Sequence, residues 1–200
     1  APGAAVTNMG DSFPAFGTYW YNYHCLPTLP DGRKNPFHDP RVRKAFSLAV
    51  DKKNLCENIK RCGEVPAAVI IPPGSIGGYP SPKGLPCAPD PAAIDMARQL
   101  LKDAGYAKPS DLPVIEILFN SDGGHDKVAQ AVKNDWEKYL GVTVRLVPSH
   151  GSLENLRRLS GPASDVDVGF VQVGVKLPDP APGEARRELA SLGTIGRQPL

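Results

Sequence analysis

The sequence lacks a long uninterrupted run of apolar residues. No segment of its 200 residues approaches the length needed to cross a bilayer, so we expect none to span a membrane. It also lacks a charge imbalance: the formal net charge is +2 and no basic cluster occurs, which argues against binding to nucleic acid. The first ten residues have neither a charged n-region nor an apolar h-region, so we expect any signal peptide to lie outside this chain.

Catalytic motifs are missing as well. There is no GxSxG, no HExxH, no Walker loop and no glycine-rich fingerprint between a strand and a helix. The nearest candidate is the turn NSDGGH at 120–125, where Ser121, Asp122 and His125 offer catalytic side chains and exposed amides could hold an anion. Residues this close along one turn seldom reach catalytic geometry, and the favoured alternative is that Ser121 or Asp122 caps a helix. We therefore predict no enzyme activity and no catalytic residues.

Cysteine is scarce, with four in the chain: Cys25, Cys56, Cys62 and Cys87. An even set permits disulfides in an oxidising compartment, and reduced, partly buried thiols are the alternative. A zinc site is not expected, because Cys56 and Cys62 lack CxxC spacing and only His24 adjoins a cysteine. We predict no metal and no cofactor.

Proline and glycine, by contrast, are plentiful, at 22 and 20 residues, and they concentrate at 71–91. A segment of this kind is a surface excursion, ordered or flexible, and composition does not decide which. Hydrophobic residues make up 41% and charged residues 22% of the chain, as in an ordinary soluble globular protein.

The remaining segments alternate between strand and helix patterns. Strands are predicted at 17–24, 112–120, 142–148 and 165–175. Helices are predicted after Asp39, Asp51 and Asp90, after the turn SDGGHDK with its apolar face from Val128 to Leu140 and its end at Gly141, and after Ser152. This order predicts an α/β fold with a mixed, mostly parallel sheet flanked by helices. We expect a loose lead at 1–15, one folded unit at 16–180 and a tail at 181–200 in which at most GEARRELASL forms a short helix.

Five segments in order resemble a known family. GTYWYNY, NPFHDPRVRKAFSLAVDKKNL, GEVPAAVIIPPG, DPAAIDMARQLLKDAGY and ILFNSDGGHDKVAQAVKNDWEKYLGVTVRL are similar to the peptide-binding family of ABC-transporter solute-binding proteins, the oligopeptide and dipeptide binders of extracellular solute-binding protein family 5. The resemblance runs from about Phe16 to Pro180. It implies a single lobe, the second or C-terminal one, of a type II periplasmic-binding-protein-like fold that closes on its ligand as a hinged clamp.

The same resemblance implies a ligand site. Its implied cleft residues are Tyr19, Tyr21, Asn22, His125, Phe170, Val173 and Lys176. His125 matches a histidine near the family's cleft, whereas Asn22 replaces an acidic residue and Phe170 an arginine. Val173 and Lys176 stand where oligopeptide binders carry a tryptophan and the acidic residue that pairs with the peptide's amino terminus. Because a lysine repels an ammonium group, the resemblance implies a peptide held differently or a solute with an acidic group for Lys176.

The leading hypothesis is thus the ligand-binding lobe of an extracytoplasmic solute-binding protein of an ABC importer. The implied partners are a peptide or small solute, a first lobe outside this chain and a membrane permease, with a monomer and no nucleic acid expected. The implied location is periplasmic or otherwise extracytoplasmic, which is compatible with a lipid anchor on the full-length protein and favours disulfides Cys56–Cys62 and Cys25–Cys87. The alternative is a stand-alone structural or protein-interaction domain derived from that lobe.

Overall fold

The computed structural model describes residues 18–29, 32–121, 123–160, 166–171 and 189–196, the last range and Phe170 by their backbone. The elements in chain order are β1 (Tyr19–His24), η1 (Pro36–His38), α1 (Pro40–Leu48), α2 (Lys52–Asn54), η2 (Leu55–Lys60), α3 (Pro91–Asp103), η3 (Pro109–Asp111), β2 (Ile115–Asn120), α4 (His125–Leu140), β3 (Val144–Ser149), α5 (Ser152–Ser160), β4 (Val168–Phe170) and β5 (Leu189–Gly196).

The five strands form one sheet in the order β3-β2-β4-β1-β5. Strand β2 runs parallel to both β3 and β4, whereas β1 runs antiparallel to β4 and β5. The predicted α/β fold with a mixed sheet is confirmed. Its parallel part consists of β3, β2 and β4, and the antiparallel pairings come from β1 and its edge neighbour β5.

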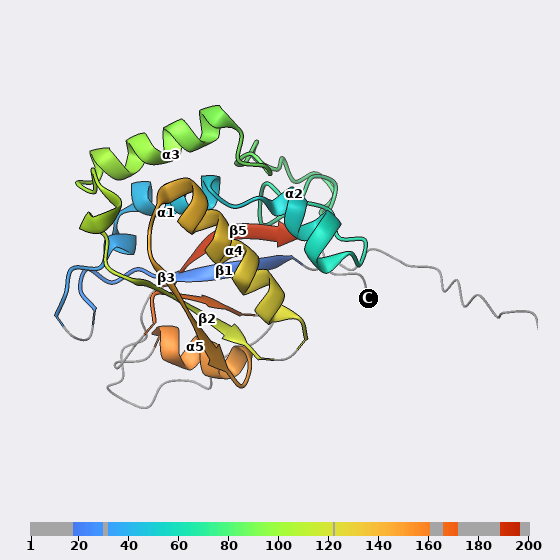
Figure 1. Ribbon diagram of the computed structural model, residues 1–200. Coiled ribbons are helices and arrows are strands. Elements are labelled where there is room, and N and C mark those ends of the chain that lie inside the picture. Colours follow the sequence, from blue (N-terminus) through green and yellow to red (C-terminus); the bar gives the residue numbers. More distant parts are fainter. Residues whose placement is uncertain (1–17, 30–31, 122, 161–165, 172–188, 197–200) are drawn as a thin grey trace, which may run out of the picture.

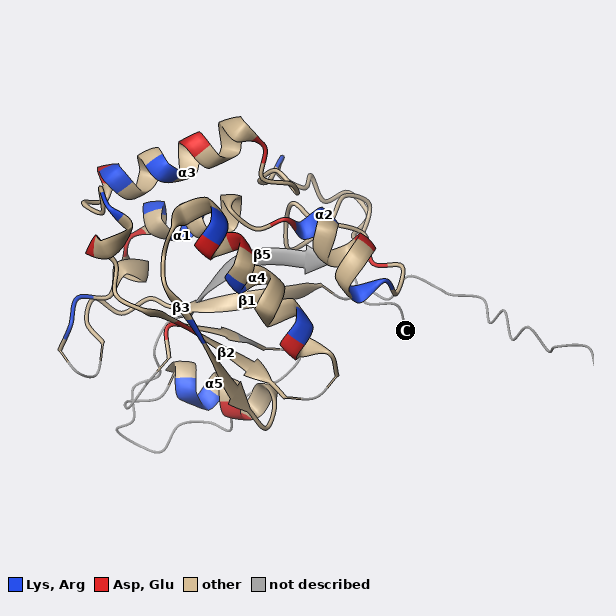
Figure 2. Cartoon of the chain, in the orientation of Figure 1, with Lys and Arg blue, Asp and Glu red and all other residues tan. Residues whose placement is uncertain are grey.

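Helices cover both faces of this sheet (Figure 1). Helices α1, α3 and α4 lie on one face, and α5 lies on the other. The larger core fills the first interface and centres on Trp136, whose ring meets Phe46 edge-to-face at 4.9 Å and whose Nε1–H donates to the Phe46 carbonyl at 3.0 Å. The smaller core, beneath α5, packs Leu159 against Leu118. Acidic and basic residues are interspersed along the outer helices (Figure 2).

Two short helices meet at a corner where the sequence pattern predicts them. The side chain of Asp39 accepts a hydrogen bond from the Arg41 amide at 2.8 Å and caps α1, whose first residue is Pro40. The side chain of Asp51 accepts one from the Asn54 amide at 2.8 Å and caps α2, which continues into the π-helical segment η2. Asp90 caps α3 in the same way.

One local expectation was wrong, and a second was wrong for one of its two candidate residues. Residues 189–196, expected in a tail with at most a short helix, form strand β5 against β1; residues 181–188 lie outside the described residues. Pairing with a neighbouring strand, which no local pattern encodes, decides this structure. Helix α4 begins after Gly124, which has φ of 74° and makes no side-chain cap, so Ser121 does not cap it; Asp122 is not described.

The disulfide expectation was also wrong: all four cysteines are thiols. Cys56 is buried inside η2, whereas Cys62 lies exposed beyond the end of η2, after Arg61 in the left-handed conformation. This reversal of the backbone directs the two side chains into different surroundings. Within the residues described, no helix is long and apolar enough to cross a membrane.

Candidate functional site

The carboxyl ends of the parallel strands and the start of β1 meet at one edge of the sheet. Strand β2 ends at Asn120 and β3 at Ser149, which are register partners. Because β1 runs antiparallel to β4, its first residue, Tyr19, lies at the same edge. His125, the first residue of α4, follows directly after the turn that leaves β2. Ligands of open α/β sheets commonly bind at this edge.

Tyr19 and His125 form a pair there. The Tyr19 hydroxyl and His125 Nδ1 share a hydrogen bond of 2.8 Å, and the two rings stack with centroids 5.6 Å apart. Burial raises the pKa of the Tyr19 hydroxyl well above its usual range, and nearby Tyr21 adds to this. The hydroxyl therefore stays protonated and donates to Nδ1, which assigns the proton of a neutral His125 ring to Nε2.

The turn that positions His125 depends on two glycines. Gly123 and Gly124 have φ of 66° and 74°, the left-handed region that glycine occupies without strain. A Cβ on Gly123 would lie 3.2 Å from His125 Nε2, so the imidazole lies close over the backbone of this turn. A side chain at position 123 would crowd the nitrogen that we assign as the donor.

Lys60 joins the pair from η2. Its ammonium lies 6.0 Å from the centroid of the Tyr19 ring and 3.9 Å from a carboxylate oxygen of Glu64. Sequence reasoning missed this residue, because the contact joins positions 19 and 60 across two elements. No local signal distinguishes Lys60 from any other polar residue at the end of a helix.

A buried polar network supports the same edge from below. Asn155 of α5 donates to the side chain of Asn120 at 2.7 Å, and Ser149 and Asn155 share a side-chain hydrogen bond. Asn120, Ser149 and Asn155 are 7%, 4% and 0% exposed. Such a network holds the ends of β2 and β3 in register beneath the Tyr19–His125 pair.

The structure brings together only part of the predicted site. Tyr19 and His125 meet, but Tyr21 is 1% exposed and packs in the core. Asn22 lies on the opposite face of β1, where it accepts a hydrogen bond from Trp20 Nε1 at 3.1 Å. The side chain of Phe170 and the residues Val173 and Lys176 lie outside the described residues.

The two described polar side chains of the turn that were considered for catalysis, Ser121 and His125, have partners within the fold. The Ser121 hydroxyl donates to the Ser149 carbonyl at 3.2 Å, and Nδ1 of His125 is engaged by Tyr19. Across the described residues, no group of three or more His, Cys, Asp and Glu side chains is placed to hold a metal ion.

Residues 3–183 match the sequence profile described as bacterial extracellular solute-binding proteins, family 5 Middle. The chain belongs to this family. Among its relatives, the oligopeptide-binding protein OppA of Bacillus subtilis is 32% identical over 134 residues, 66% of this chain and 23% of OppA. The periplasmic murein peptide-binding protein MppA of Escherichia coli is 33% identical over 133 residues, again 66% of this chain and 23% of the relative.

Solved structures of the family agree with the fold. The Escherichia coli murein tripeptide-binding protein MppA superposes with a TM-score of 0.64 and 29% identity, covering 80% of this chain and 30% of that protein. An oligopeptide-binding OppA from Burkholderia pseudomallei gives a TM-score of 0.61 at 26% identity. The predicted periplasmic-binding-protein-like fold is thereby confirmed. The chain spans about a quarter of the length of the curated family members that it matches.

Proposed function

We propose that this chain is the ligand-binding lobe of an extracytoplasmic solute-binding protein of an ABC importer, which takes a peptide or a related small solute. Family membership and the peptide-binding names of the relatives OppA and MppA support the solute class. The observation that carries the proposal is the Tyr19–His125 pair with Lys60 beside it, at the carboxyl edge of the sheet. The rest of the cleft would come from a lobe outside this chain, and delivery would require a permease.

The chemistry of this edge favours an acidic group on the ligand. Lys60 supplies a cation that it shares with the Glu64 carboxylate at 3.9 Å, and His125 supplies an Nε2–H donor oriented by Tyr19. The 16-residue helix α4 begins at this point, and its N-cap residue, Gly124, has no side chain to cap the helix, so the first amides and the dipole also favour negative charge. A ligand carboxylate, such as a peptide carries, fits these donors better than an ammonium group does.

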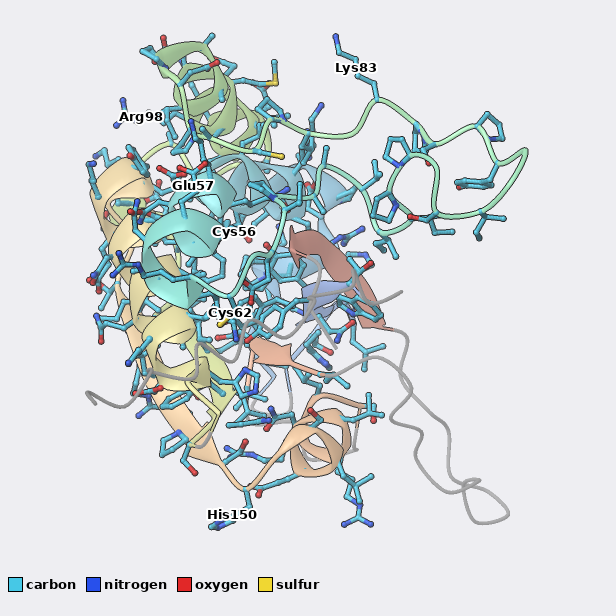
Figure 3. All side chains as sticks on the ribbon, turned by 90° about the vertical axis from the view of Figure 1, so that its right-hand side faces the viewer. Cys56, Glu57, Cys62, Lys83, Arg98 and His150 are labelled. Atoms are coloured by element: carbon cyan, nitrogen blue, oxygen red, sulfur yellow. The ribbon has the colours of Figure 1, made fainter. Side chains whose placement is uncertain are left out.

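Binding to the lobe is tested by NMR titration of the ¹⁵N-labelled chain with tri- and tetrapeptides, and with the same peptides amidated at the carboxyl end. A single lobe offers half a cleft, so we expect millimolar affinity, with shifts at Tyr19, Lys60 and His125 that are lost on amidation. His125→Gln should weaken binding several-fold. His150→Gln is the matched control, because His150 is exposed just after β3, the edge strand that β2 and β4 separate from β1 (Figure 3).

The alternative is a stand-alone interaction domain derived from the lobe. Peptides that shift no resonance at this edge would contradict the binding proposal and favour this alternative. The size of the native gene product in an envelope extract separates the two independently. A product several times longer than this chain supports a lobe of a larger binding protein, and a product of this length supports the stand-alone domain.

A further inference from the structure

Lys60 is a largely buried cation whose ammonium makes no hydrogen bond to an acceptor in the described part of the chain. Its side chain is 19% exposed, and its carboxylate partner there, Glu64, lies 3.9 Å away, beyond hydrogen-bond distance. The ammonium also lies 6.0 Å from the centroid of the Tyr19 ring. An ammonium carries three donors, and burial makes a donor without an acceptor costly. Lys60 is therefore able to take a stronger acceptor than Glu64.

Glu64 is held in place by the turn that ends η2. Arg61 has φ of 56°, in the left-handed region that non-glycine residues rarely adopt, and Gly63 has φ of 84°. The chain reverses here, so the Cys62 amide donates to Glu64 Oε2 at 3.1 Å while Oε1 is the oxygen nearest Lys60. Figure 3 shows this turn, with Cys62 labelled at the end of η2.

Of the two charged groups, Lys60 is the one that can move. The Glu64 side chain is 5% exposed and is bonded to the backbone at Cys62, so its carboxylate is fixed. Lys60 is more exposed and has a flexible four-carbon stem. Its ammonium can therefore swing away from Glu64 while the carboxylate stays where it is.

A ligand carboxylate at this edge would compete with Glu64 for Lys60. The Lys60 ammonium and the His125 ring both lie against the Tyr19 ring, at 6.0 Å and 5.6 Å from its centroid, so one acidic group can meet both donors. A direct ammonium–carboxylate hydrogen bond of about 2.8 Å is stronger than a pair held at 3.9 Å. Exchange of one anion for another also leaves the charge of Lys60 compensated, which a neutral ligand group does not do.

We propose that Glu64 is an internal competitor for the ligand's acidic group. It holds Lys60 in the free lobe and releases it when a carboxylate binds beside Tyr19 and His125. Glu64 thereby lowers the affinity for carboxylates, which favours their release, and keeps Lys60 from neutral groups without itself touching the ligand. This inference rests on the proposed function, because it concerns the same site, and it adds what controls the strength and charge selectivity of binding there.

The test is an NMR titration of the labelled 200-residue chain and of its Glu64→Gln variant with a tetrapeptide, and with the same peptide amidated at the carboxyl end. Glu64→Gln removes the charge but keeps an oxygen to accept from the Cys62 amide. It should tighten binding of the free-carboxylate peptide by about threefold to fivefold, the strength of a partly exposed ion pair. The amidated peptide should still cause no shifts at this edge.

Glu154→Gln is the matched control. Glu154 also accepts a backbone amide, that of His150 at 2.9 Å, and it also pairs with a basic residue four positions away, Arg158 at 3.6 Å. It belongs to α5, on the face of the sheet opposite α4. Its replacement should therefore leave peptide affinity unchanged.

Two further measurements separate release of Lys60 from other effects of Glu64. In the Lys60→Met background, Glu64→Gln should recover no binding, because no cation is left to release. In wild type, the Lys60 Cε and Glu64 Cδ resonances should move together as the free-carboxylate peptide is added. This wild-type measurement decides the outcome even if a variant folds poorly.

The outcomes distinguish this inference from the proposed function. Wild-type binding with no gain in Glu64→Gln, with an equal gain for the amidated peptide, or with static Lys60 and Glu64 resonances would overturn the competitor and leave the binding lobe standing. Recovery of binding by Glu64→Gln in the Lys60→Met background would do the same, because it would show that Glu64 only repels the ligand. Peptides that bind this edge in neither wild type nor Glu64→Gln would overturn both.

Discussion

Asp135 on α4 should make the stability of this protein depend on pH in a specific window. Its carboxylate accepts a hydrogen bond from the Asp51 amide at 2.9 Å, at the corner between α1 and α2. Burial, with a further contribution from the charge of Asp51, raises the pKa of Asp135 from 3.8 to about 6. Between about pH 4 and pH 6 the folded state therefore holds a proton that the unfolded state has lost.

The size of the effect follows from linkage. A shift of about two pKa units corresponds to ~3 kcal/mol, and since Asp135 keeps some contact with solvent we expect ~2–3 kcal/mol. The stability of the folded state falls as pH rises. The contribution of the protonated Asp135 carboxyl to the free energy of unfolding is fully present below about pH 4 and is lost as pH rises through about 6. Asp135→Asn cannot ionise but keeps an oxygen to accept from the Asp51 amide. The free energy of unfolding of the variant minus that of wild type should therefore be ~2–3 kcal/mol larger at pH 7.5 than at pH 4.

Urea unfolding of both proteins at these two pH values, followed by tryptophan fluorescence, measures this difference. Comparing variant with wild type at each pH cancels the other carboxyl groups, which titrate in the same range. Asp126→Asn is the matched control on the same helix, because Asp126 is exposed in the first turn of α4. A stability difference between Asp135→Asn and wild type that is equal at both pH values would refute the reasoning.

Two further predictions concern packing. Trp136→Phe should destabilise the fold by ~2–4 kcal/mol, because it shrinks a fully buried ring and leaves the Phe46 carbonyl without its donor. Urea unfolding followed by circular dichroism measures this loss, and a loss below ~1 kcal/mol would contradict the prediction. Gly169→Ala should cost ~1–3 kcal/mol, because its Cβ would lie 2.7 Å from Leu159 Cδ1. Gly77→Ala is the control, because no atom lies within 4 Å of the Cβ it would add. Equal stability of the two variants would contradict the prediction and would show that Leu159 of α5 moves aside without a measurable cost.

The sequence alone determined the local elements of this fold. Asp39 with Pro40, Asp51 and Asp90 place helix starts correctly because a cap is satisfied within one turn of chain. Helix α4 and strands β2 and β3 follow from apolar spacing, which is set by which face of an element must be buried. The order of these segments also sufficed to identify the family, because that order reflects the whole lobe and not one motif.

Tertiary structure alone decided what meets at the carboxyl edge of the sheet. Tyr19, Lys60 and His125 come from three separate elements, and strand order and helix packing bring them together. The same holds for Tyr21. Its position in β1 is compatible with the core or with a cleft wall, and the helices packed on the sheet decide that it is buried. Strand β5 and the state of the cysteines likewise depend on partners distant in sequence. A local pattern records how a residue relates to its own helix or strand, and contacts between elements depend on how those elements pack.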